Sequence, residues 1–145
     1  MNNALKASIV ALIIAVCLIV FLFKSRTGKL VGNFELDYID IEDNMAIYYN
    51  DPTWGGIGVI DATVFAVGYN DKFIIAKQHP YSDFRIEKST TNYFIISIIA
   101  LKSSLDESLQ YKTLGPLTES DFLEERKQLG VPKSLDFTVN FKDLE

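Results

Sequence analysis

The run IDATVFAVGYNDKFIIAKQH, residues 60–79, decides the fold of this chain. Two segments rich in β-branched and aromatic residues flank Asn70-Asp71, a pair that tolerates the left-handed backbone of a two-residue hairpin turn. Both segments are apolar on both faces, as expected of strands in the middle of a sheet. A turn at this pair predicts the cross-strand neighbours Gly68 with Phe73, Val67 with Ile74, Ala66 with Ile75, and Phe65 with Ala76. In that register the ring of Phe73 covers the bare backbone at Gly68.

Other segments predict further strands around this hairpin. Residues 53–58 contain three glycines and indicate a loop, and residues 80–91 are too hydrophilic to be core. Residues 102–110 are polar and are predicted as a loop or one weak helical turn. Strands are predicted at residues 34–38, 45–49, 92–101, 111–114 and 135–141. The strand at 92–101 is placed beside Phe73–Lys77, and the strand at 135–141 is expected at a closing edge.

One helix is predicted, at residues 119–129. Thr118 is a favourable N-cap with Asp121 three residues later, Gly130 fits the residue after the helix, and Pro132 prevents continuation. The fold class is therefore α+β: an antiparallel meander of about five to seven strands with one C-terminal helix.

Residues 7–23 form an apolar run of about 17 residues, close to the length that crosses the hydrocarbon core. We therefore predict a membrane helix in residues 1–24, a linker in residues 25–33 and a globular domain in residues 34–145. A cleaved signal peptide is disfavoured because no small-x-small site follows the run. A lipoprotein signal ending at Cys17 stays an alternative, although Val16 is bulkier than that signal prefers.

The net charge and the number of cysteines argue against several classes of protein. A net charge of −5 argues against a nucleic-acid partner, because no basic stripe is present to neutralise phosphates. The single cysteine, Cys17, lies in the apolar run, so the globular domain has neither an internal disulfide nor a cysteine-ligated metal. No cofactor is predicted.

Three groups of residues could form a chemical site, and each also has a purely structural interpretation. Gly55-Gly-Ile-Gly58 precedes a strand rather than a helix, so it does not predict a phosphate cradle. His79 can be combined with Ser82 and Asp83 as a triad, which leaves a small hydrolase as an alternative of another class. Five acidic residues suggest calcium binding: Asp37, Asp40, Glu42, Asp43 and Asp51. From Asp40 the oxygen-bearing residues loosely follow an EF-hand loop, but Met45 replaces the turn glycine and no flanking helices are predicted, so we interpret them as a solvated strand edge.

An aromatic set is the best candidate for an interaction surface. Tyrosine, tryptophan and arginine are the usual anchors of protein interfaces, provided that the loops which carry them converge. The candidate residues are Tyr48, Tyr49, Trp54, His79, Tyr81 and Arg85.

The C-terminal half carries a resemblance to a known family. Phe73–Gln78, Tyr93–Ile96 and Gly115–Glu119, followed by Phe122 and the Leu129-Gly-Val131 run, resemble a family of small bacterial lipoprotein-like, membrane-anchored proteins labelled only as a domain of unknown function. The resemblance covers roughly residues 57–135 and carries over no catalytic residue.

The resemblance and the charge pattern disagree on topology. The resemblance implies a single-pass membrane protein of the bacterial envelope with its domain outside the cytoplasm. Lys24, Arg26 and Lys29 follow the apolar run, which by the positive-inside rule places the domain in the cytoplasm. We follow the resemblance. The leading hypothesis is a non-enzymatic envelope protein whose domain binds another protein or an envelope component, with an immunity-type inhibitor of a basic toxin as the alternative.

Overall fold

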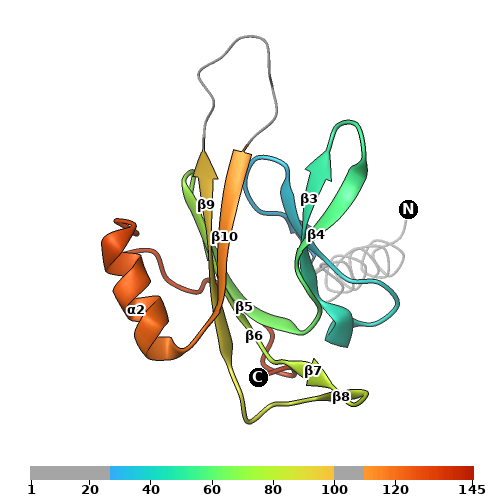
Figure 1. Cartoon of the computed structure of the whole chain (residues 1–145). Helices are drawn as coiled ribbons and strands as arrows, with labels where there is room; N and C mark the ends of the chain where they lie inside the picture. Colours follow the sequence, from blue (N-terminus) through green and yellow to red (C-terminus); the bar gives the residue numbers. More distant parts are fainter. Residues whose placement is uncertain (1–26, 100–109) are drawn as a thin grey trace, which may run out of the picture.

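The computed structural model describes residues 27–99 and 110–145, which form two main antiparallel sheets, a small two-stranded sheet and a helix (Figure 1). The smaller main sheet has four strands in the order β1-β2-β3-β4. These are β1 (Gly28–Lys29), β2 (Phe34–Asp37), β3 (Ala46–Asp51) and β4 (Gly55–Ile60). The 3-10 turn η1 (Glu42–Asn44) lies between β2 and β3.

The second sheet has five strands in the order β10-β9-β6-β5-β11. They are β5 (Val64–Tyr69), β6 (Phe73–Gln78), β9 (Asn92–Ile99), β10 (Gln110–Leu117) and β11 (Val139–Asn140). The hairpin predicted within residues 60–79 is β5–β6, which lies inside this sheet, and β9 pairs with β6 as predicted. A separate two-stranded hairpin is formed by β7 (Tyr81–Ser82) and β8 (Arg85–Ile86).

The five-stranded sheet is covered on both faces (Figure 1). One face packs on the four-stranded sheet, where Phe34, Ile74 and Ile96 are fully buried. The other face packs on helix α2 (Glu119–Gln128), which buries Phe122 against Ile75 and Ile95. The two apolar faces of the central strands are therefore each used, by a different layer.

The prediction of one meander was wrong, because the strands divide into two sheets. β4 and β5 are consecutive but do not pair, and between them Thr63 adopts a left-handed backbone with φ of 76°. Apolar alternation shows which residues are buried, but it does not show which strand they face.

The register of the β5–β6 hairpin also differs from the prediction by two residues. Gly68 lies opposite Ile75, and Val67 opposite Ala76. The turn is centred on Asp71-Lys72, and the side chain of Asn70 accepts hydrogen bonds from the backbone N–H groups of Lys72 and Phe73, both at 2.9 Å. A two-residue shift keeps every side chain on its face, so the burial pattern could not distinguish the two registers.

Gly68 is covered by backbone rather than by the predicted Phe73 ring. A Cβ atom built on Gly68 would collide with the backbone carbonyl of Asp136. The segment after α2 crosses β5 there, and it is held by the N–H of Thr138 on the carbonyl of Val67 at 3.0 Å. A glycine is needed at this position so that the two backbones can approach closely.

The predicted helix is confirmed, with its caps. The N–H of Asp121 donates to the Thr118 hydroxyl at 3.2 Å, and Gly130 adopts φ of 70° directly after the C-cap. The N–H of Val131 then donates to the carbonyl of Arg126 at 2.9 Å, which completes a Schellman ending.

Several boundaries differ from their predictions. Part of the predicted linker is strand β1, and most of the predicted glycine loop is strand β4, whose three glycines pair with Asp51, Asn50 and Tyr48. The predicted closing strand is shortened to β11.

The predicted membrane anchor, residues 1–24, and nearly all of segment 102–110 lie outside the described residues. Within the ranges 27–99 and 110–145, no helix has the length and apolar character needed to span a bilayer.

Candidate functional site

The hairpin β7–β8 projects from the fold with an aromatic side chain at its tip. Its turn residues Asp83 and Phe84 have φ angles of 47° and 60°, the left-handed pair typical of a type I′ turn. The Phe84 side chain is 92% exposed. A bulky residue is uncommon in this backbone region because its Cβ crowds the neighbouring carbonyl. The hairpin therefore holds an apolar side chain in water at a cost in backbone strain.

A pocket of ≈ 430 Å³ lies at the base of this hairpin. Its lining residues come from three parts of the chain: Asn44, Asp61, Ala62, Gln78, Pro80 and Tyr81. The loop before Asn44 exposes Ile39 and Ile41, and the Asn44 side chain donates to the carbonyl of Ile39 at 3.1 Å. We call residues 38–44, Asp61 and residues 81–87 the hairpin end; β7 and β8 mark it at the bottom of Figure 1.

The hairpin end combines exposed apolar groups with negative charge. Tyr81 and Phe84 from the hairpin and Ile39 and Ile41 from the loop are all exposed. The acidic side chains exposed among them are Asp40, Asp43, Asp61, Asp83 and Glu87, against one cation, Arg85. This composition suits a surface that is basic and carries apolar side chains.

His79 anchors the base of the hairpin from inside the fold. Its side chain is 3% exposed, and its ring stacks on Phe65 at 4.2 Å between centroids. The ring Nδ1 lies 2.7 Å from the carbonyl of Thr90, which can only accept, so Nδ1 carries the proton. The Thr63 hydroxyl donates to the backbone carbonyl of His79. These contacts are typical of a structural histidine.

Gln78 ties the same region to the turn before β5. Its side-chain amide donates to the carbonyls of Asp61 and Ala62, both at 3.0 Å, and its oxygen accepts from Asn92 at 3.3 Å. Because a buried amide is costly unless its groups are paired, this arrangement fixes the floor of the pocket.

The residues of the hypothetical hydrolase triad have other partners. The Ser82 hydroxyl donates to the carboxylate of Glu87 at 3.3 Å, while the proton-bearing nitrogen of His79 faces Thr90. The buried Nε2 of His79 has no hydrogen-bond partner among the described residues.

The structure brings together only part of the predicted aromatic set. Tyr81 and Arg85 lie at the hairpin end, whereas His79 precedes the hairpin and is buried. Trp54, 81% exposed, lies at the β3–β4 turn, at the opposite end of the molecule in Figure 1. Tyr48 is half-buried in β3.

Tyr49 is a core residue rather than a surface residue. Its ring lies 5.1 Å from the rings of Phe34 and Tyr111, and its hydroxyl is buried without a partner among the described residues. Burial, followed by the nearby Tyr49 and then Asp51, raises the pKa of Tyr111 above its usual value of 10.0. On the helix side, burial and then Glu119 raise the pKa of Tyr93 in the same direction.

Phe84, Ile39 and Ile41 were missed by reasoning from the sequence. The available signal was an isolated aromatic residue between Asp83 and Arg85, inside a segment otherwise too polar for the core. A single exposed apolar residue is ordinary, however, so only its place beside the loop makes it notable.

The acidic run considered for calcium forms turns instead. The Asp51 carboxylate accepts from the backbone N–H groups of Thr53 and Trp54 at 2.7 and 3.0 Å. In the part of the chain that the structure describes, no three acidic, histidine or cysteine side chains cluster as metal ligands would.

The fold and the hairpin end describe a small two-sheet domain with one covering helix and an exposed apolar-acidic end. Residues 31–145 match the profile of a family described as a protein of unknown function, DUF3997, and the chain belongs to that family. This confirms the predicted membership of a domain of unknown function. The same comparisons found no matching curated protein and no matching solved structure.

Proposed function

We propose that this chain is a non-enzymatic binding module of the bacterial envelope, held at the membrane by residues 7–23, and that its hairpin end binds a basic protein. The observation that carries the proposal is Phe84, 92% exposed on a left-handed turn. Strained residues persist where the surrounding structure holds them, and they concentrate at sites of contact with ligands.

The acidic groups around Phe84 define the partner's chemistry. An apolar centre ringed by carboxylates favours a partner that offers lysine or arginine around an apolar patch. The negative charge also disfavours an anionic lipid surface as the occupant, because like charges repel. A protein partner therefore fits the hairpin end better than the membrane does.

Photocrosslinking in cells tests this proposal. A benzophenone amino acid replaces Tyr81 in the full chain, and a matched probe replaces Trp54, the exposed aromatic residue at the opposite end. The expected result is an adduct with a basic protein from position 81, weakened by Asp61→Lys but not by Asp71→Lys at the β5–β6 turn. Equal adducts from both positions, or an acidic partner, would overturn the proposal.

The membrane side of the proposal has a separate test. We propose that the domain faces away from the cytoplasm, which the family resemblance supports. Alkaline phosphatase fused after Glu145 should then be active, because it folds only in an oxidising compartment. An inactive fusion of normal abundance would place the domain in the cytoplasm.

The acidic hairpin end also favours the narrower alternative, an immunity-type inhibitor. In that case the basic partner is a toxin, and producing the chain protects cells from it. Phe84→Gly would remove this protection if the same surface makes the contact.

A further inference from the structure

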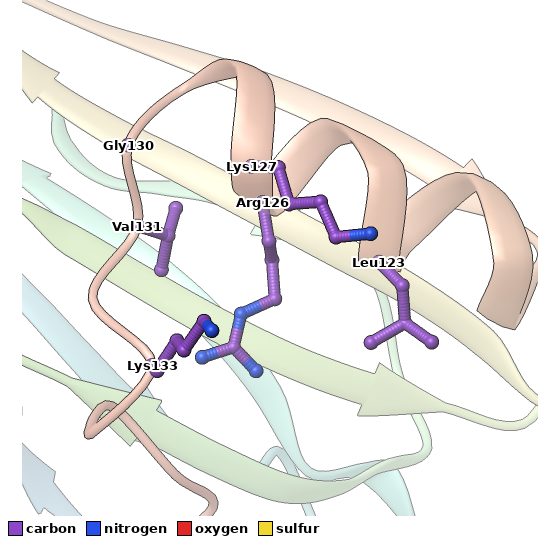
Figure 2. A pocket seen from close by; sticks show the side chains of 6 residues that line it. All are labelled: Leu123, Arg126, Lys127, Gly130, Val131 and Lys133. Carbon is purple, nitrogen blue, oxygen red and sulfur yellow. The ribbon is translucent and has the colours of Figure 1, made fainter.

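A second surface of opposite charge lies beside helix α2. A groove of ≈ 470 Å³ runs between the end of the helix and the segment that follows it (Figure 2). Its lining residues are Leu123, Arg126, Lys127, Gly130, Val131 and Lys133. This volume is within the range of sites that hold a small molecule or a short peptide segment.

The Schellman ending of α2 builds this groove. Gly130 reverses the chain with a left-handed backbone, so Lys133 returns alongside the helix (Figure 2). A Cβ atom built on Gly130 would meet no atom within 4 Å, so the glycine leaves the groove wall open. The ending that stops the helix therefore also shapes the surface beside it.

The floor of the groove is apolar. Leu123 is 49% exposed, which leaves a large aliphatic surface in water, and the side chain of Val131 is buried in the same core cluster as Phe122 of α2. The exposed Leu129 adds apolar surface at the C-cap of the same helix.

Arg126 is held in place within the groove. Its Nη2 atom donates to the carbonyls of Pro132 and Leu135 at 3.0 and 2.6 Å, and its guanidinium lies 5.4 Å from the ring centre of Phe122. No described residue accepts from its Nε or Nη1 groups, so a fixed cation keeps free donors.

Two lysines add mobile positive charge on either side of Arg126 (Figure 2). Among the described residues, neither the Lys127 nor the Lys133 ammonium has a hydrogen-bond or ion-pair partner. A cation at Lys127 is partly explained by the negative end of the helix dipole, but Lys133 lies beyond the helix. Three cations around an apolar floor stand out in a chain whose net charge is −5.

From this arrangement we infer that the groove binds an acidic peptide segment of another protein, with one apolar side chain on the floor and carboxylates on the cations. Lys127 and Lys133 lie on either side of Arg126 (Figure 2), so they fit a ligand with carboxylates on both sides of an apolar side chain. A small molecule with one carboxylate could not pair with both lysines. This site is separate from the hairpin end, whose charge is opposite.

Fluorescence anisotropy tests the inference with the full chain in nanodiscs of phosphatidylcholine. The probe is a labelled peptide with one leucine flanked on each side by two glutamates. Binding should weaken at least about tenfold in Lys127→Glu/Lys133→Glu, and stay unchanged in Lys72→Glu/Lys142→Glu, which alters the net charge equally. Phe84→Gly should bind the peptide normally, which separates this test from that of the proposed function.

Control peptides examine both parts of the inference. Lysine in place of glutamate should abolish binding, and serine in place of leucine should weaken it. Equal affinity for the leucine and serine peptides, equal loss in both double variants, or no binding at about 1 mM peptide would overturn the inference. So would self-association of the full chain that buries Lys127 and Lys133, because the occupant would then be a second copy.

Discussion

Two hairpins in this fold use their apolar residues in opposite ways. The β5–β6 hairpin has long strands whose apolar side chains are buried, and its turn is stabilised by the Asn70 side chain without a left-handed residue. The β7–β8 hairpin has strands of two residues, and its left-handed turn points Phe84 into water. The first hairpin holds the fold together, whereas the second presents a surface.

We therefore expect the β5–β6 hairpin to determine the stability of the fold and the β7–β8 hairpin to determine binding. Substitutions in β5–β6 should unfold the chain, while substitutions at the tip of β7–β8 should leave it folded and change what it binds. Urea unfolding of the full chain measures the change in unfolding free energy for each variant below, from the largest expected change to the smallest.

Gly68→Ala should have the largest effect, a loss of about 3–5 kcal/mol, because the added methyl group forces the backbone at Asp136 away from β5. Gly58→Ala is the matched control, since a Cβ atom there meets nothing within 4 Å. A similar change of unfolding free energy in the two variants would show that residue 136 does not cross β5 as described.

Ile75→Ala should cost about 2–5 kcal/mol, because it leaves a cavity between β6 and α2. Ile39→Ala removes the same atoms from an exposed loop and should stay within about 0.5 kcal/mol of the wild type. Equal destabilisation by both would remove the distinction between the central hairpin and the hairpin end.

Asn70→Ala should cost about 1 kcal/mol, because two backbone N–H groups of the turn lose their acceptor. Asn70→Asp keeps an oxygen at that position and should restore most of the stability. If the alanine variant is neutral, the turn is not held by this side chain.

The sequence was sufficient to predict the central hairpin, its neighbour β9, and the helix with both caps. These features depend on local signals: apolar faces, the Thr118 cap and Gly130. It was not sufficient to predict the register, because a shift of two residues preserves each face. The left-handed turn expected at Asn70-Asp71 occurs instead at Asp83-Phe84, where the phenylalanine is not a residue typical of that backbone.

The candidate site was harder to predict than the fold. Tyr49 is buried in the core whereas Trp54, five residues later, is exposed at a turn. The groove beside α2 depends on how Lys133 is placed after Gly130. Which of these residues come together is set by tertiary packing, and the periodicity of apolar residues in the sequence does not encode it.

The most direct test of this account is Phe84→Gly, measured for stability and for contact in the same chain. Glycine accepts the left-handed backbone without strain, so we expect stability to rise by about 0.5–1 kcal/mol. The adduct from a benzophenone at position 81 should fall at the same time. A variant that is destabilised like Ile75→Ala, or that keeps its full adduct, would contradict the claim that this hairpin serves contact rather than folding.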